Sequence, residues 1–154
     1  MAKEMGLGVI PWSPLASGVL AGKYTQADLD HGGGKADPAG TRKNVAAANG
    51  SLTAEGLAIA EVVKGIAKEL GKTPSQVAIA WTLLEPGVTA PILGARTLKQ
   101  LEDNFGALDV ELTESHRARL EEASAIDLGF PHDFLKRPMV QQVVFGGTKL
   151  EARH

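Results

Sequence analysis

The sequence predicts an α/β protein built around a parallel sheet. Two short apolar runs, LGVIPW at residues 7–12 and VTAPIL at residues 88–93, have the length and composition of buried strands. The order is strand, long loop, two helices, strand and two more helices, which is typical of parallel α/β folds. Two strands are too few for a stable, doubly covered parallel sheet. We therefore expect the remaining strands to be missing or to come from another chain.

Two helices are predicted between the strands. Thr53 is a suitable N-cap for the first, which covers residues 53–70 and is stopped by a glycine. Thr73 caps the second, which has Pro74 at its first position and ends at a Pro-Gly pair after residue 85. The second helix is apolar almost all round and should be heavily buried. The first has one apolar face, which comprises Ile59, Val62, Val63, Ile66 and Leu70.

Two further helices are predicted after the second strand. The first carries Leu98, Leu101, Phe105 and Leu108 on one face, at spacings of three and four. Thr113 caps the second, ESHRARLEEASAI, whose outer side is strongly charged. The remaining tail mixes aromatic residues with proline and glycine, so we expect it to be irregular and to pack across the surface.

Residues 25–52 show neither a helical nor an alternating period. They contain HGGGKADPAG at residues 31–40, which is typical of a loop. Loops of this length in compact domains are usually functional lids or disordered segments, and the pattern favours neither.

Composition and charge restrict the class of protein. The chain has 154 residues, of which 16 are Lys or Arg and 18 are Asp or Glu, so no basic excess points to nucleic acid or to an anionic membrane. No apolar run approaches the roughly 18 residues that a membrane span needs. The first residues, MAKEMGLGVIPW, lack the apolar stretch of a signal peptide, and cysteine is absent. We therefore expect a cytoplasmic protein without nucleic-acid or membrane partners.

Each predicted strand is followed by a segment suited to an anion. After the first, Ser13 offers a hydroxyl, the small residues 16–18 leave backbone N–H groups accessible, and Lys23 adds a positive charge. After the second, Gly94 forms a turn and Arg96 precedes a helix N-terminus, which favours phosphate. Ligands of parallel α/β proteins bind at the carboxyl ends of strands, so these segments indicate a phosphate site. The alternative is solvated cations and cap residues on ordinary loops.

Four segments resemble the aldo-keto reductases, in the order and spacing of that family. IPWSPLASGVLAGKY at residues 10–24 resembles the seventh-strand segment, and PILGARTLKQLEDN at residues 91–104 resembles the eighth strand and the nucleotide-binding helix after it. TPSQVAIAWTL at residues 73–83 is similar to the buried helix before the eighth strand, and LTESHRARLEEAS at residues 112–124 is similar to the next family helix. The resemblance is greatest to the branch that contains bacterial reductases and potassium-channel beta subunits.

This resemblance implies that the chain is the C-terminal part of a TIM (β/α)8 barrel. The implied partial barrel, over residues 1–154, has two parallel strands, flanking helices and a long loop that covers the cofactor. Its divisions are the seventh strand and phosphate segment at residues 1–24, the long loop at residues 25–52, the helices and eighth strand at residues 53–126, and the C-terminal tail at residues 127–154.

The resemblance also implies that the cofactor is NADP, as NADPH, bound in extended form without a Rossmann domain. Arg96 favours NADP over NAD because its guanidinium compensates the charge of the additional phosphate. Arg42 matches an arginine of the covering loop, and Asp103 stands where the family often has glutamate. The residues that match cofactor contacts are Trp12, Ser13, Pro14, Leu15, Ala16, Ser17, Lys23, Arg42, Gly94, Arg96, Gln100, Asp103 and Asn104.

The family reduces small carbonyl compounds to alcohols by hydride transfer from NADPH, with a tyrosine as general acid. In the family, that tyrosine and its Lys, Asp and His neighbours come from the early strands of the barrel. The resemblance begins at about the seventh strand, so we expect the isolated chain to be inactive. Tyr24 matches a residue of the cofactor segment instead. The other residues considered are His31, His116, His132 and His154, which have no metal-ligand spacing, and Asp127 and Asp133, which have no partner base.

The sequence leaves three functions open. The chain is the C-terminal portion of an NADP-dependent aldo-keto reductase, a non-catalytic module that binds NADP(H) for regulation, or an interaction protein. In the third case its open sheet edges would pair with another chain or with a second copy. In the first case, Phe130, Phe134 and Phe145 either line part of the carbonyl pocket or anchor the tail.

Overall fold

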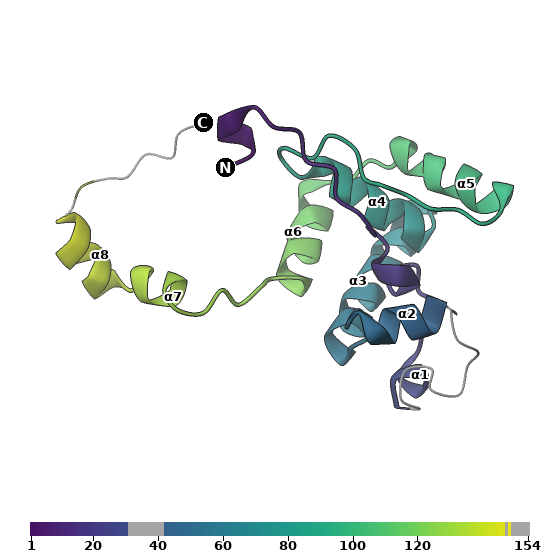
Figure 1. Ribbon diagram of the computed structural model, residues 1–154, viewed down its shortest axis with the longest axis horizontal. Coiled ribbons are helices and arrows are strands. Elements are labelled where there is room, and N and C mark those ends of the chain that lie inside the picture. The colour runs from purple at the N-terminus through teal and green to yellow at the C-terminus, as the bar shows by residue number, and fades with distance from the viewer. Residues whose placement is uncertain (31–41, 147, 149–154) are drawn as a thin grey trace. The chain divides into compact units, whose positions relative to one another are not determined.

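The computed structural model describes residues 1–30, 42–146 and 148, and helices predominate in that part of the chain (Figure 1). The chain divides into two compact units, residues 1–124 and residues 125–154. The elements of the first unit are η1 (Lys3–Met5), η2 (Ala16–Gly18), α1 (Gln26–Asp30), α2 (Arg42–Ala48), α3 (Ala54–Leu70), α4 (Pro74–Leu84), α5 (Leu98–Phe105), η3 (Gly106–Asp109) and α6 (Glu114–Ala123), where η marks a 3₁₀-helix. The second unit contains α7 (His132–Leu135) and α8 (Pro138–Phe145).

The two segments predicted as strands pair with each other in parallel. Isolated bridges join Val9 to Val88 and Trp12 to Ile92, and the two extended segments run alongside each other in Figure 1. The parallel direction is confirmed at these bridges. Among the described residues, no longer ladder forms around them.

The predicted burial of these strands is wrong. Ile10, Trp12 and Ile92 are 61%, 76% and 55% exposed. The physical reason is the shortage of strands: within the described residues, no further strand flanks the two segments and covers their apolar side chains. The apolar face of α5 is open in the same way, since Leu98 and Phe105 are 69% and 61% exposed.

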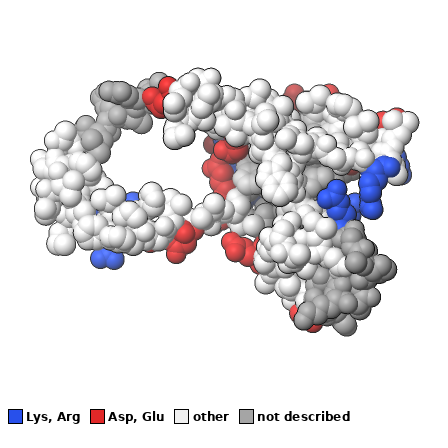
Figure 2. Space-filling model, in the orientation of Figure 1, with Lys and Arg blue, Asp and Glu red and all other residues white. Residues whose placement is uncertain are grey.

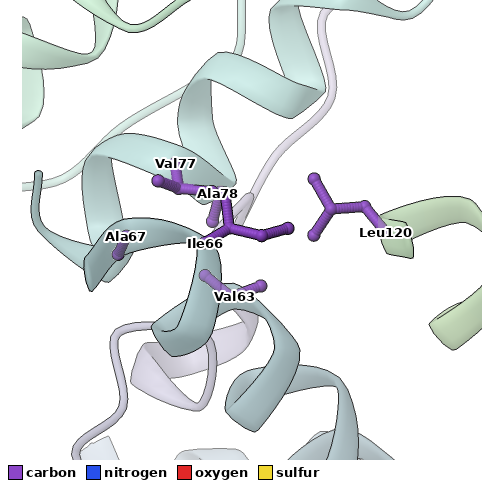
Figure 3. Packing of buried hydrophobic residues seen from close by; sticks show 6 residues of the cluster. All are labelled: Val63, Ile66, Ala67, Val77, Ala78 and Leu120. Carbon is purple, nitrogen blue, oxygen red and sulfur yellow. The ribbon is translucent and has the colours of Figure 1, made fainter. Parts of the chain in front are cut away.

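The core of the first unit confirms the two central helices. Helix α3 buries Val63 and Ile66 completely against Val77 of α4, and Leu120 of α6 closes the cluster (Figure 3). The predicted caps are present, because the Thr53 hydroxyl accepts a hydrogen bond from the backbone of α3 and Thr73 forms a capping box at the start of α4.

A second, smaller cluster positions the candidate site. Val19, next to η2, packs with Ala46 of α2 and with Leu57 and Ala60 of α3, and all four are buried. This cluster fixes the segment after the first strand against α2.

The expectation of a region without regular structure at residues 25–52 is wrong for its described part. Helix α1 begins just after Thr25, whose backbone N–H donates to the Asp28 carboxylate at 2.8 Å. Helix α2 ends in three alanines, of which Ala46 is buried against the second cluster. Small alanine side chains give no apolar stripe, which explains why periodicity missed this helix. Residues 31–41, with the glycine-rich run, lie outside the described residues.

The tail was also expected to be irregular, but the structure forms α7 and α8 there. Pro138 occupies the first position of α8, and Gly146 ends it in the left-handed conformation. Proline at the start and glycine just past the end are the usual boundaries of a helix. In the described parts of both units, no helix has the length and apolar content to cross a membrane.

Candidate functional site

The segment that follows the first strand forms a series of tight turns with unusual backbone angles. Ser13, Ala16 and Ser17 have positive φ values of 58°, 47° and 56°. Such a conformation costs a non-glycine residue of order 1–3 kcal/mol and occurs preferentially at ligand sites. Two short hydrogen bonds close the turns, from the Ala16 N–H to the Ser13 carbonyl at 2.9 Å and from the Gly18 N–H to the Leu15 carbonyl at 2.8 Å.

Ser17 is held in this conformation from two sides. It is 7% exposed, and its hydroxyl accepts a hydrogen bond from the Asn49 side-chain amide at 3.0 Å. Its backbone carbonyl accepts a hydrogen bond from the Tyr24 hydroxyl at 3.2 Å. Gly18 follows with a φ of 100°, a left-handed conformation that favours glycine.

Two arginines predicted from separate segments approach the same region. Arg42 begins α2, and its guanidinium lies 4.0 Å from the position that a Cβ on Gly94 would occupy. Arg96 lies in the turn before α5, where its backbone N–H donates to the Gln100 side chain at 2.9 Å. Figure 2 shows Lys and Arg side chains gathered near the starts of α2 and α5. The structure thus places the predicted arginine of the loop next to the glycine of the second phosphate segment.

Both arginines also affect the pKa of Tyr24. Burial raises the pKa of the Tyr24 phenol above its ordinary value, and the charges of Arg42, Arg96 and Lys43 lower it, while that of Asp28 raises it. Both arginines therefore act on a single hydroxyl group. Since the pKa remains raised, Tyr24 is a neutral donor at physiological pH and can keep its hydrogen bond to Ser17.

The charge at the start of α2 is partly neutralised. The Lys43 ammonium lies 2.9 Å from the Asp28 carboxylate. This hydrogen bond, together with two from Thr25, lowers the pKa of Asp28 to about 2. By contrast, Arg42 and Arg96 form no ion pair with any side chain in the described part of the chain.

Other predicted cofactor residues make structural contacts. Asp103 accepts a hydrogen bond from the Thr73 hydroxyl at 3.2 Å, and its backbone carbonyl accepts one from the Gln76 side chain at 3.0 Å, which ties α5 to α4. Asn104 is 7% exposed, and Leu15 packs against the main core. Pro14 is partly buried, whereas Trp12 and Lys23 are exposed.

Three residues near the site, Asn49, Lys43 and Asp28, were not predicted from the sequence. The Asn49–Ser17 contact joins residues 32 positions apart, so no local pattern could indicate it. Asp28 had a local signal, because Thr25 followed three residues later by an acidic residue is a capping pattern.

His116 lies in the helix whose outer side was expected to be strongly charged, but its side chain is only 13% exposed. Its Nδ1 accepts a hydrogen bond from the Thr113 N–H at 3.3 Å, and its Nε2 lies 3.4 Å from a Glu69 carboxylate oxygen. Arg119 donates to the same oxygen at 2.8 Å and, as the main cause, lowers the pKa of Glu69. These contacts join α6 to α3, so the role of His116 is structural.

The remaining candidates provide no second centre in the part of the chain that the structure describes. No three His, Asp or Glu side chains there come close enough together to hold a metal ion. In the second unit, the Phe130 and Phe134 rings lie 5.9 Å apart, and the Arg137 guanidinium lies 6.0 Å from the Phe134 ring centre. His132 and Asp133 lie in α7, and both are exposed. His31 and His154 lie outside the described residues.

Comparisons with known proteins identify the family of the chain. The sequence profile of the Aldo/keto reductase family matches residues 1–125. The chain is 39% identical over 111 residues to the uncharacterized oxidoreductase YrpG of Bacillus subtilis (strain 168), covering 72% of this chain and 30% of the relative. It is 42% identical over 111 residues to a probable voltage-gated potassium channel subunit beta of Oryza sativa subsp. japonica, covering 68% and 31%. It is 37% identical over 125 residues to the chloroplastic pyridoxal reductase of Arabidopsis thaliana, covering 79% and 30%. The chain therefore spans about three tenths of the length of these relatives.

Proposed function

Because the chain belongs to the Aldo/keto reductase family, we propose that it is the NADP-binding, C-terminal portion of a cytoplasmic carbonyl reductase with a TIM barrel fold. The observation that carries the proposal is the placement of Arg42 beside Gly94, together with Tyr24, whose hydroxyl donates to Ser17 of the strained segment and whose pKa is raised by burial and lowered by the charges of both Arg42 and Arg96. Aldo/keto reductases generally use a nicotinamide cofactor, and the excess of guanidinium charge favours the form with the additional phosphate.

The residues present fit such a cofactor. Arg42 and Arg96 have no ion-pair partner among the described side chains and would neutralise phosphate charge, and Gly94 lies beside the Arg42 guanidinium. The turns at Ser13–Ser17 would offer the pyrophosphate those backbone N–H groups that are not bonded within the turns, as the Ala16 N–H is, because tight left-handed turns bind anions in this way. When bound, the cofactor would supply the hydride for carbonyl reduction. This chain's part is to bind and orient it.

We assign cofactor binding to this chain and the role of general acid to other parts of the barrel. Tyr24, its one tyrosine, donates to the Ser17 carbonyl, and is thereby engaged in holding the phosphate segment. A general acid typically contributes a factor of 10²–10⁴ to the rate. We therefore expect turnover to need parts of the barrel beyond this portion, and the isolated chain to bind NADPH without reducing aldehydes or ketones.

Fluorescence titration of the purified chain with NADPH tests the proposal. We expect saturable binding that weakens roughly 10- to 100-fold in Arg96→Ala and Arg42→Ala, because each loses a charge-assisted contact. NADH, which lacks the additional phosphate, should bind more weakly and respond less to Arg96→Ala. Arg137→Ala in the second unit removes the same charge and is the matched control. Absence of saturable binding, or an equal loss in the control, would refute the cofactor site.

A regulatory role without catalysis is the second candidate. It is favoured by the relatives from rice and Arabidopsis thaliana named probable voltage-gated potassium channel subunit beta, at 42% and 41% identity. These two functions are distinguished by an assay of NADPH oxidation, with an aldehyde substrate, by the complete protein of which this chain is proposed to be a portion. Consumption of NADPH supports the reductase, whereas tight binding without consumption supports the regulatory module.

A further inference from the structure

We propose that Asn49 and Tyr24 are positioning residues that clamp Ser17 and thereby hold the Ser13–Ser17 segment in its cofactor-binding conformation. The inference deepens the proposed function and rests on it. It concerns two side chains that need not touch the cofactor. They act through Ser17, which is buried and hydrogen-bonded on both its hydroxyl and its carbonyl.

The Asn49 amide is oriented at both ends. Its oxygen accepts a hydrogen bond from the Ser51 N–H at 3.1 Å, so its nitrogen faces Ser17 and donates to the hydroxyl at 3.0 Å. The backbone N–H of Asn49 donates to the Val45 carbonyl at 3.0 Å, which fixes the residue to the last turn of α2. A side chain restrained in this way presents one donor in one direction.

Tyr24 holds the opposite side of the same residue. Its hydroxyl donates to the Ser17 carbonyl, and its side chain is partly buried against the second cluster. Ser17 and Ala16 have left-handed backbones that serine and alanine rarely adopt without support from their surroundings. The two hydrogen bonds on Ser17 provide that support.

Helix α2 connects this clamp to Arg42, which is proposed to bind phosphate. Arg42 begins the helix, and Asn49 directly follows its last residue. The position of one short helix therefore sets both the guanidinium beside Gly94 and the donor to Ser17. It follows that the phosphate segment and Arg42 should respond together to a change in the clamp.

The test compares Asn49→Ala, Tyr24→Phe and Ser17→Ala with the double variant Asn49→Ala/Ser17→Ala. If Asn49 acts through Ser17, each single change raises the Kd for NADPH roughly three- to tenfold, and the double variant is no weaker than the single ones. Ser124→Ala, which removes a comparable serine hydroxyl from the end of α6, should leave the Kd unchanged. Additive losses, or a Kd unaffected by Asn49→Ala while Arg96→Ala weakens binding, would overturn the clamp.

Amide hydrogen exchange provides a readout that does not depend on the cofactor. In Asn49→Ala and Tyr24→Phe, the N–H groups of Ala16 and Gly18 should exchange faster, while those of the α3–α4 core keep their protection. Unchanged exchange at both amides would overturn the clamp, whether or not NADPH binds. Faster exchange in a chain that fails to bind NADPH would retain the clamp and refute the proposed function instead.

Discussion

The ion pair between Asp28 and Lys43 determines how much positive charge the start of α2 presents. The Lys43 ammonium lies 2.9 Å from the Asp28 carboxylate, next to Arg42 in the sequence. Ionised Asp28 therefore offsets one of the two adjacent cations and also raises the pKa of Tyr24. Protonation of Asp28 removes one negative charge from beside Lys43.

The first prediction concerns this pair. The pKa of Asp28 is lowered from 3.8 to about 2, chiefly by Lys43 and then by Thr25. A lowered folded-state pKa stabilises the fold above pH 3.8, and this contribution is lost as the pH falls towards 2. In Lys43→Met, an NMR titration should show the carboxyl pKa rising towards, but not reaching, 3.8, because the Thr25 bonds remain. Lys64→Met, which breaks a pair with Glu61, is the control. An unchanged Asp28 titration in Lys43→Met would contradict the assignment.

At the same scale, sequence motifs indicated residues that could contact the cofactor, but not the residues that fix their conformation. Arg42, Arg96 and Ser17 were predicted from motifs, and the structure brings them near Tyr24. Asn49 was not predicted, because its contact with Ser17 arises only when distant segments fold together. Charge-bearing motifs are local in sequence, whereas positioning hydrogen bonds depend on tertiary structure.

At the scale of elements, a close approach between η3 and α4 depends on a glycine. A Cβ on Gly106 would overlap the side-chain amide of Gln76. That amide accepts from the Thr73 N–H at 3.0 Å and donates to the Asp103 carbonyl at 3.0 Å, so it both caps α4 and anchors α5. The glycine is required by packing, since its own φ of −60° is one that alanine adopts readily.

The second prediction follows from this overlap. Gly106→Ala should lower the free energy of unfolding by about 1–3 kcal/mol, because Gln76 must move and break its hydrogen bonds. In a Gln76→Ala background the same change should be neutral or stabilising, by up to about 1 kcal/mol, since alanine is favoured over glycine in helical backbone. Urea denaturation of the four variants measures both effects.

Gly65→Ala serves as the matched control for this cycle. Gly65 lies within α3, and an added Cβ would make only an ordinary contact with Arg119 at 3.6 Å. We expect it to stabilise the protein by about 0.5–1 kcal/mol. A destabilising Gly106→Ala that is equally destabilising without the Gln76 side chain would show that the overlap is not the cause.

The elements themselves were predictable where amphipathic periodicity was strong. Helices α3 and α4 match their predicted ranges closely, because threonine caps and a clear apolar pattern coincide there. Helices α1, α2, α7 and α8 were missed because they are short, with four to eight residues each, so periodicity has little length in which to appear. Packing and end caps stabilise such helices more than their own pattern does.

At the scale of the whole chain, an intact helical core is combined with an incomplete sheet. Helices α3, α4 and α6 bury Val63, Ile66 and Leu120 completely. The paired segments, by contrast, are joined by isolated bridges and expose Ile10, Trp12 and Ile92. The sequence predicted this shortage from its two strands, and the chain spans about three tenths of its relatives' length. A sheet is a collective structure, so its strands become regular and buried only when their neighbours are present.

The last prediction concerns these exposed strand residues. Contiguous apolar surface and open strand edges promote association between copies. We therefore expect the weight-average sedimentation coefficient of the chain to rise with concentration in sedimentation velocity experiments.

Ile10→Lys combined with Ile92→Lys places charges on the paired segments, at side chains that are 61% and 55% exposed in the native chain. This variant should stay monomeric to roughly tenfold higher concentration, with little change in the stability of the helical core. Met139→Lys changes a residue in α8 that is 73% exposed, and it should leave association unaffected. If the native chain is monomeric throughout, or if Met139→Lys suppresses association equally well, the open sheet is not the surface through which copies of this chain meet.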